Sequence, residues 1–237
     1  MSEQVLAVEG MSRSFGSVSV LSEVTLSFES GSFTGIVGPN GAGKTTLLGV
    51  LAGLLRPTGG ERSYLGPDAE RRIGYLPQQP EFRPGFTVQE TLDFYTALAD
   101  DDPEALLAEV GLADAADRRV EDLSGGMTRL LGLAQAMVGD PPVVMLDEPA
   151  SGLDPGMRRR TYEVARDLAD TGTAVLCTSH DLDLVEGSCD RAIVLDGGEV
   201  AADGEPATLQ DRYDAADLWE VFEAAVSGPA DTVEVLA

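Results

Sequence analysis

The sequence predicts an α/β fold, and three patterns lead to that class. Short apolar segments of strand type alternate with segments of helical periodicity, as in a parallel sheet flanked by helices. Residues 38–45 match the motif G-x-x-x-x-G-K-[ST] and stand between a strand-like and a helix-like segment. A mainly helical stretch at 79–140 interrupts the alternation, which indicates a subdomain inserted into the α/β core.

The N-terminal third carries the first strands and the glycine-rich loop. The first two strand-like segments precede the loop and predict an antiparallel β portion ahead of the core, while the third leads directly into the loop. A helix is expected at 45–55, ending near Pro57. The expected strands of this third are residues 5–8, 24–28, 32–37 and 73–76.

Helix-start signals dominate the middle of the chain. Thr87 with Glu90 forms a capping box, and Asp102 followed by Pro103 is typical of a helix N-terminus. Ser124 begins a third helix, which the two prolines after Asp140 end. The expected helices span residues 88–99, 103–110 and 124–138.

The alternation of strand and helix resumes after this insertion. Asp154 and Pro155 open a helix, and Gly197 with Gly198 turns the chain into Val200. The expected elements are strands at 143–146, 174–178 and 192–195 and a helix at 155–170. The predicted organisation is a discontinuous nucleotide-binding core (1–78 and 141–205), a helical subdomain (79–140) and a C-terminal helical segment with an acidic tail (206–237). An amphipathic run at Leu218, Trp219 and Phe222 is expected to pack on the core.

The charge of the chain is strongly acidic. Sixteen lysines and arginines stand against 41 aspartates and glutamates, which gives a formal net charge of −25 and a pI near 4.1. The dispersed negative charge argues against a nucleic-acid partner. A dispersed acidic surface almost without lysine favours a cytoplasm with molar salt, as in a halophilic archaeon, with an ordinary acidic protein as the alternative.

The cysteines and the N-terminus bear on the compartment. Cys177 and Cys189 lack the spacing of a redox or zinc motif, so both are expected to be free thiols in a reducing compartment. The first ten residues lack the features of a signal peptide, and no apolar stretch approaches membrane-spanning length. These features predict a soluble cytosolic chain.

The glycine-rich loop predicts a phosphate site. Lys44 is the only lysine of the chain, and a compact ammonium suits close contact with β- and γ-phosphate oxygens better than a guanidinium does. The glycines allow several N–H groups to point at one anion, and the hydroxyl of Thr45 can bind Mg²⁺. The predicted binding residues are Gly38, Pro39, Asn40, Gly41, Ala42, Gly43, Lys44, Thr45 and Thr46.

Two carboxylates follow the apolar run 143–146. Asp147 and Glu148 thus stand at the carboxyl end of a buried strand, where ligands collect in open α/β sheets. Because neighbouring strand side chains point to opposite sides, we expect Asp147 to hold Mg²⁺ and Glu148 to face an attacking water. An acidic pair closing a surface strand is the alternative, but the four preceding apolar residues disfavour it.

Residues 123–127, Leu-Ser-Gly-Gly-Met, resemble the LSGGQ signature of ABC-family ATPases, which have a P-loop NTPase fold. Together with residues 147–155 they extend the resemblance over most of the chain. Ser124, Gly125 and Gly126 at a helix start form a second small anion site, although alone they would indicate an ordinary helix cap. Met127 and Ala150 depart from the family pattern, which more often has Gln and Thr there.

The resemblance implies roles for further residues. Gln78 is similar to the family's Q-loop glutamine, which contacts Mg²⁺ and the attacking water, although the neighbouring Gln79 makes its register ambiguous. His180, the only histidine, matches the switch histidine, and Phe15 matches the aromatic residue that stacks on adenine. Glu148 would be the catalytic base, with Gln78 and His180 assisting it.

The resemblance also implies partners: a head-to-tail homodimer that sandwiches two Mg·ATP and drives a separate membrane permease. The protein would then be a cytoplasmic ATPase held at the inner face of the membrane by the permease, which would dock near residues 78–87. The alternative is a soluble ABC-type ATPase acting in cofactor assembly, translation or nucleic-acid maintenance. Residues 123–134 are also similar to the accessory ATPase of nitrous oxide reductase maturation.

Overall fold

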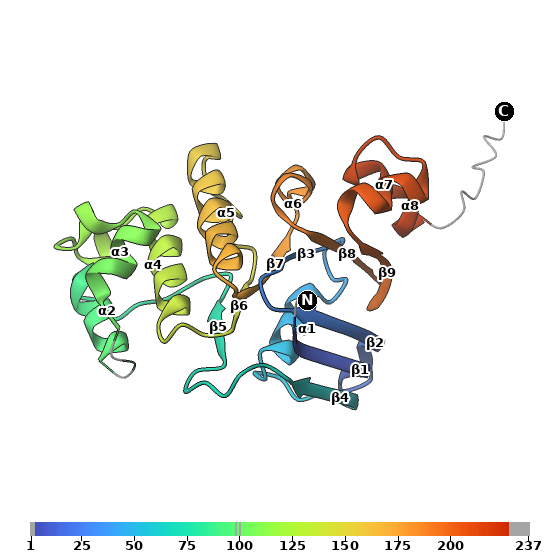
Figure 1. Cartoon of the computed structure of the whole chain (residues 1–237), viewed down its shortest axis with the longest axis horizontal. Coiled ribbons are helices and arrows are strands. Elements are labelled where there is room, and N and C mark those ends of the chain that lie inside the picture. Colours follow the sequence, from blue (N-terminus) through green and yellow to red (C-terminus); the bar gives the residue numbers. More distant parts are fainter. Residues whose placement is uncertain (1–2, 98, 100, 228–237) are drawn as a thin grey trace.

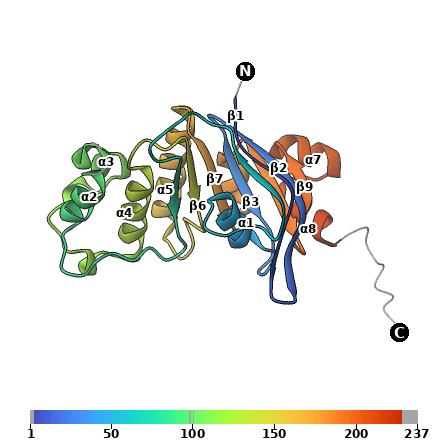
Figure 2. The same cartoon turned by 90° about the horizontal axis from the view of Figure 1, so that it is seen from below.

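A computed structural model of the chain describes residues 3–97, 99 and 101–227. It has an α/β architecture with two sheets, as predicted (Figures 1 and 2). One sheet has three antiparallel strands in the order β2-β1-β4, and the other has six strands in the order β5-β6-β7-β3-β8-β9. Among the described residues, no helix is both long and apolar enough to cross a membrane.

Five of the strands in the larger sheet run parallel, and β9 adds an antiparallel edge. Its strands are β3 (Phe33–Val37), β5 (Ile73–Leu76), β6 (Val143–Leu146), β7 (Ala174–Ser179), β8 (Arg191–Asp196) and β9 (Glu199–Gly204). Val37 pairs with Ser179, and Leu76 pairs with Leu146. The carboxyl ends of these strands therefore meet at one edge of the sheet.

The smaller sheet confirms the predicted antiparallel N-terminal portion. Its strands are β1 (Gln4–Phe15), β2 (Val18–Glu29) and β4 (Gly59–Tyr64). β1 and β2 are much longer than their apolar centres suggested, because backbone pairing extends along the polar residues of both strands. The sequence did not predict β4, since Gly-Gly-Glu-Arg-Ser-Tyr has neither apolar alternation nor strong strand formers.

Helices cover both faces of the larger sheet. Helix α1 (Lys44–Leu51) lies between the two sheets, while α5 (Pro155–Asp170) and α6 (Leu182–Ser188) lie on the opposite face (Figures 1 and 2). Helix α1 is shorter than predicted, because the chain leaves it through Gly53 in a left-handed conformation (φ 76°). Helix α6 was not predicted; Asp181 caps it by accepting a hydrogen bond from the N–H of Leu184.

The region between β5 and β6 is helical, as predicted. It contains α2 (Val88–Thr96), α3 (Pro103–Val110), the 3₁₀ turns Ala113–Ala115 and Val120–Asp122, and α4 (Gly125–Met137). The expected capping box is present: Thr87 accepts from the N–H of Glu90, whose carboxylate accepts from the N–H of Thr87. These helices extend to the left of the sheet in Figure 1, with α4 nearest to β5.

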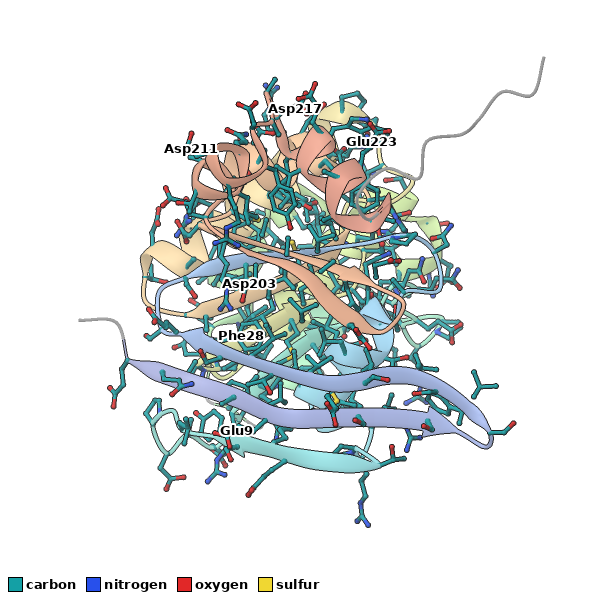
Figure 3. All side chains as sticks on the ribbon, turned by 90° about the vertical axis from the view of Figure 1, so that its right-hand side faces the viewer. Glu9, Phe28, Asp203, Asp211, Asp217 and Glu223 are labelled. Carbon is teal, nitrogen blue, oxygen red and sulfur yellow. The ribbon has the colours of Figure 1, made fainter. Side chains whose placement is uncertain are left out.

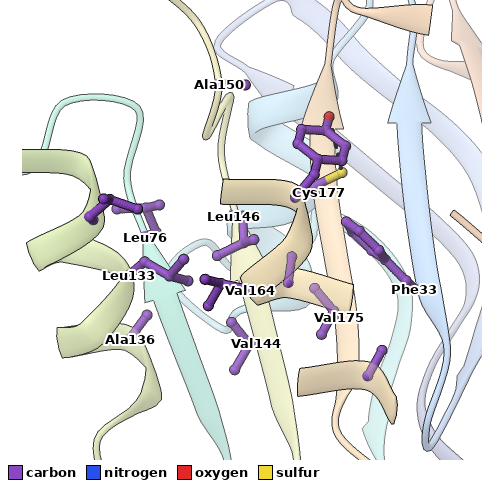
Figure 4. Packing of buried hydrophobic residues seen from close by; sticks show 14 of the residues in the cluster. Phe33, Leu76, Leu133, Ala136, Val144, Leu146, Ala150, Val164, Val175 and Cys177 are labelled. Atoms are coloured by element: carbon purple, nitrogen blue, oxygen red, sulfur yellow. Dashed lines mark hydrogen bonds between the residues drawn. The ribbon is translucent and has the colours of Figure 1, made fainter. Parts of the chain in front are cut away.

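The core is two apolar layers, one on each side of the larger sheet. Figure 4 shows the layer beneath α4 and α5, where Leu133 lies close to Leu76 and Val164 lies over Leu146. Gly74 of β5 allows the end of α4 to approach, because a Cβ there would lie 1.9 Å from the backbone oxygen of Ala136. The absence of a side chain at residue 74 thus determines how closely α4 packs on the sheet.

Two short helices end the described part of the chain. These are α7 (Pro206–Tyr213) and α8 (Leu218–Ser227). Glu186 of α6 holds both, since its carboxylate accepts from Nε2 of Gln210 (2.8 Å) and from the N–H of Leu218 (2.7 Å). Leu218 is buried and Phe222 packs on the core, as predicted, but Trp219 is 53% exposed. Most of the predicted acidic tail lies outside the described residues.

Gly74→Ala should lower the free energy of unfolding by about 1–3 kcal/mol or more, because the new methyl group would overlap a backbone atom. Urea unfolding measures the change. Gly187→Ala in α6 is the control, since a Cβ there meets nothing within 4 Å. The control should match the parent or exceed it by up to about 1 kcal/mol. Equal stability of the two variants would contradict the packing described.

Candidate nucleotide-binding and catalytic site

The loop between β3 and α1 has the backbone shape that its glycines predict. Gly41 (φ 85°) and Gly43 (φ 101°) lie in the left-handed region, where a side chain would be strained. At Gly38 a Cβ would lie 2.2 Å from the backbone oxygen of Leu195. The loop can therefore curl closely against the sheet only with glycine at these places.

Lys44 lies inside the loop at the start of α1. Its Nζ donates to the backbone oxygens of Gly38 (2.7 Å) and Pro39 (3.2 Å), and the residue is 7% exposed. Burial lowers the pKa of Lys44, while the nearby carboxylates of Glu148 and Asp147 act in the opposite direction. Gly43 caps the helix without a side-chain hydrogen bond, so the positive end of α1 is left to interact with an anion.

Asp147 lies between two hydroxyl groups. The Oγ1 atoms of Thr45 (3.1 Å) and Thr178 (2.7 Å) both donate to its Oδ1, and the hydroxyl of Tyr75 lies 3.5 Å from its Oδ2. Burial, followed by the charge of Asp147, raises the pKa of Tyr75 to about 12, so this hydroxyl keeps its proton. The carboxylate of Asp147 is thus held in one orientation beside Thr45.

The backbone of Glu148 is not that of a strand residue, as the prediction assumed. Strand β6 ends at Leu146, and Glu148 has a left-handed backbone (φ 50°), so the alternation of strand side chains does not orient it. Its N–H donates to Oγ1 of Thr178 (2.8 Å), and its carbonyl accepts from Nη1 of Arg129 and from the N–H of Ser151. Burial raises the pKa of the Glu148 carboxyl, and the charge of Lys44 opposes that shift.

His180 follows the last residue of β7, as predicted. Its Nε2 lies 2.8 Å from Oε1 of Glu148, an oxygen that accepts no hydrogen bond among the described residues. Burial and the neighbouring charge of Lys44 lower the pKa of His180, which favours the neutral imidazole. The imidazole and the carboxylate therefore face the same space.

A cleft of about 380 Å³ opens beside these groups. It brings together most of the predicted site, including Gln78 from the segment after β5; Gln79 does not line it, which favours the predicted register. The lining residues are Val20, Asn40, Gly41, Gly43, Lys44, Thr45, Thr46, Gln78, Glu148 and His180. Gly38, Pro39 and Ala42 do not line the cleft but take part in hydrogen bonds within the loop. Asp147 does not line it either and accepts a hydrogen bond from Thr45, which does.

Two predicted binding elements do not line this cleft. Phe15 is 46% exposed near the β1–β2 turn, with the guanidinium of Arg13 4.3 Å from its ring centre. Adenine stacking on Phe15 stays a prediction. Ser124 caps α4 by accepting from the N–H of Met127 (3.3 Å), and Ser124 and Gly125 are exposed on the surface. Met127 packs partly against the core, and Gly126 packs against Met157.

Three residues of the site were missed from the sequence: Tyr75, Arg129 and Thr178. The sequence predicted Thr178 only as the end of a strand and Arg129 only as part of a helix. The available signals were a hydroxyl two residues before the histidine and the one charged side chain of that helix. Neither signal predicts which residue the side chain contacts, because these contacts join residues that are far apart in the sequence.

The oxygen atoms at the edge of the cleft fit Mg²⁺. Thr45 and Asp147 offer hard oxygen donors that lie within hydrogen-bond distance of one another, and Gln78 lines the same space. The described residues contain no cluster of three or more His, Cys, Asp or Glu side chains suited to a metal. A Mg²⁺ ion bound next to phosphates usually has only one or two protein ligands, because water and phosphate oxygens supply its remaining ligands.

Comparison with known proteins identifies the family to which these site residues belong. The family model described as ABC transporter matches residues 21–151, more than half of the chain. The chain belongs to the ABC transporter family. The match includes the phosphate loop, the signature residues and the two carboxylates, and it confirms the predicted family and the ATPase coupled to transport.

Known members of the ABC transporter family match this chain over most of its length. The Nod factor export ATP-binding protein I of Cupriavidus pinatubonensis is 35% identical over 92% of this chain and 71% of its own length. The protein of the same description from Burkholderia lata is 37% identical over 88% of this chain and 73% of its own length. This chain is therefore the ATP-binding subunit of an ABC transporter.

Solved structures agree. The structure of the ATP-binding subunit of an ABC transporter has a TM-score of 0.81 and 26% identity, and the match covers 93% of this chain and 99% of that one. The ADP conformation of another ATP-binding cassette has a TM-score of 0.79 and 25% identity, covering 94% of this chain and 99% of that one. These matches confirm the P-loop ABC ATPase fold.

Lys44→Arg should weaken ATP binding although it keeps the charge. The broader guanidinium does not fit a buried position between the backbone oxygens of Gly38 and Pro39. Titration calorimetry with Mg·ATP should show a dissociation constant raised about tenfold or more. Arg72→Lys, at an exposed ion pair with Asp68, is the control and should bind normally. An unchanged dissociation constant for Lys44→Arg would count against the assignment.

Proposed function

We propose that two copies of this ATPase subunit clamp two Mg·ATP head-to-tail and that closure and hydrolysis drive a separate membrane permease that exports its substrate. The observation that supports this most directly is a division of the phosphate-binding elements. Lys44, Glu148 and His180 surround one cleft, whereas Ser124 and Gly125 lie outside it on the surface. A second copy could therefore bring its Ser124 to the nucleotide held here.

Each residue of the cleft has a role in in-line attack of water on the γ-phosphate. The loop N–H groups and Lys44 bind the phosphates, and Glu148 polarises the attacking water. His180, whose Nε2 lies 2.8 Å from Oε1 of Glu148, supports that geometry. Thr45, Gln78 and Asp147 would hold Mg²⁺, which counters the charge on the phosphates when it is bound.

The buried carboxylate of Glu148 suits the role of base. Its Oε1 is buried 2.8 Å from Nε2 of His180 and accepts no hydrogen bond among the described protein groups, so it remains an unsatisfied acceptor. Burial raises the pKa of the Glu148 carboxyl, so its carboxylate is a stronger base than that of an exposed glutamate. Lys44 would at the same time neutralise phosphate charge beside it.

Export is proposed from the relatives, which are described as export ATP-binding proteins. The permease would hold this subunit at the cytoplasmic face of the membrane, docking near residues 78–87. We propose the same division into a core (1–78, 141–205), a helical subdomain (79–140) and a C-terminal segment (206–237). In this scheme the helical subdomain carries both the permease contact and the signature residues. It can therefore pass the closure of the dimer on to the permease.

Glu148→Gln should leave ATP binding intact and lower turnover at least about 100-fold, because the amide keeps the shape but cannot accept the proton. The measurement is phosphate release by the subunit assembled with its permease. Glu9→Gln on the surface of β1 is the control and should turn over normally. If Glu148→Gln kept most of its rate, the assignment of the base would be wrong.

Adaptation to molar salt remains a proposal from the surface charge. Carboxylates are spread over separate elements, as Figure 3 shows for Glu9, Asp211, Asp217 and Glu223. Such a surface is stabilised when salt screens repulsion between like charges. The relatives named above do not bear on the salt adaptation, and they do not support the narrower resemblance to the nitrous oxide reductase branch.

The melting midpoint should rise between about 0.1 M and about 1 M KCl, where the Debye length falls from about 10 Å to about 3 Å, and continue upward in higher salt. Differential scanning calorimetry at fixed pH measures it. The same series in sucrose separates screening of charge from general exclusion of a cosolute. A midpoint that is constant or falls with KCl would contradict the proposal.

A further inference from the structure

The peptide groups of Glu148 are held by side chains from two different parts of the fold. On one side its N–H donates to Oγ1 of Thr178, which lies fully buried on β7. On the other side its carbonyl accepts from Nη1 of Arg129, which belongs to α4. The backbone of the proposed base is thus tied both to the central sheet and to the helix that follows the signature residues.

The conformation of Glu148 makes these two contacts important. A left-handed backbone at a residue other than glycine is strained and persists only where the surrounding structure holds it. The direction of the buried carboxylate depends on that backbone, since a different φ would turn the side chain away from the cleft. The two hydrogen bonds, together with the turn closed by the N–H of Ser151 (3.2 Å), hold this conformation.

Thr178 gives the fixed side of this arrangement. Its hydroxyl accepts from the N–H of Glu148 and donates its own proton to Oδ1 of Asp147 (2.7 Å), so one side chain sets both carboxylate residues. Thr178 belongs to β7, which is buried in the sheet and paired on both sides. This contact therefore moves only with the core.

Arg129 gives the other side, which belongs to the helical region. It lies on the first turns of α4, a 13-residue helix whose N-cap is Ser124. Because a helix moves as a rigid body, a shift of the signature residues shifts Arg129 as well. A displacement of about 1 Å at a reacting group can change a rate about 100-fold.

We infer that Arg129 is a positioning residue that couples the location of its own signature helix to the carboxylate of Glu148 in the same chain. This rests on the proposed function, in which Glu148 activates water. When α4 stands in its present position, Arg129 holds the Glu148 carbonyl and the carboxylate faces the cleft. When α4 moves away, the contact is lost and hydrolysis slows before the nucleotide leaves. The signature helix thereby acts on the site of its own chain, besides its proposed contact with the other nucleotide.

The test uses the full subunit assembled with its permease. Arg129→Met keeps the apolar stem but has no donor, and Arg129→Lys restores a charged donor. The expected result for Arg129→Met is a kcat lowered about 10- to 100-fold with KM for ATP within about twofold of the parent, and partial recovery of kcat in Arg129→Lys. A residue needed only for packing would lower the melting midpoint without this split between kcat and KM.

Arg160→Met is the matched control. Its Nη2 also donates to a backbone carbonyl, that of Glu109 at 2.6 Å, and so also ties the helical region to the core, but away from the cleft. It should keep the parent kcat. The inference is overturned if Arg129→Met keeps half or more of the parent kcat, or if its loss of rate matches its loss of folded protein.

Glu148→Gln in the same assay separates the two ideas. If Glu148→Gln is inactive while Arg129→Met is normal, the positioning role fails and the proposed base stands. If Glu148→Gln is active, the proposed base itself fails. Should Arg129→Met not fold, Arg129→Leu, which also lacks a donor, is judged by the same split.

Discussion

The site depends on the register of three parallel strands. Val37 of β3 pairs with Ser179 of β7, and Leu146 of β6 pairs with Cys177 of the same strand. The residues that leave these strands therefore emerge side by side at one edge of the sheet. A slip of one residue would displace a strand end by about 3.3 Å, more than the hydrogen bonds of the site tolerate. The strands are apolar and buried on both faces, so packing holds this register.

The charges at this edge are balanced against their burial. Lys44, Asp147 and Glu148 are each less than one tenth exposed, a costly arrangement for separate ions. Burial lowers the pKa of Lys44 and raises that of Glu148, while their mutual attraction opposes both shifts. Two threonine hydroxyls satisfy Asp147 in the same space. The site thus holds opposite charges close together in the space where phosphates and a divalent cation would bind.

Sequence reasoning succeeded where a local signal carries the structure. The bounds of β6, α3 and α5 agree with the prediction, because an apolar run or an Asp-Pro start marks each of them. The motif residues were predicted for the same reason. β4 was missed because its pairing with β1 supplies what its polar sequence lacks. Strand alternation was the wrong reason for the orientation of Glu148, since its backbone is held by contacts with Arg129 and Thr178 that lie 19 and 30 residues away.

The single lysine of the chain has a consequence for chemical labelling. Apart from the α-amino group, the ammonium of Lys44 is the only primary amine, and it lies in the phosphate loop. Because burial lowers its pKa, a larger fraction of this amine is unprotonated and nucleophilic than for an exposed lysine at the same pH. An amine-selective reagent, followed by mass spectrometry of the peptide that contains Lys44, therefore reports occupancy of the phosphate loop in this chain without any engineered tag.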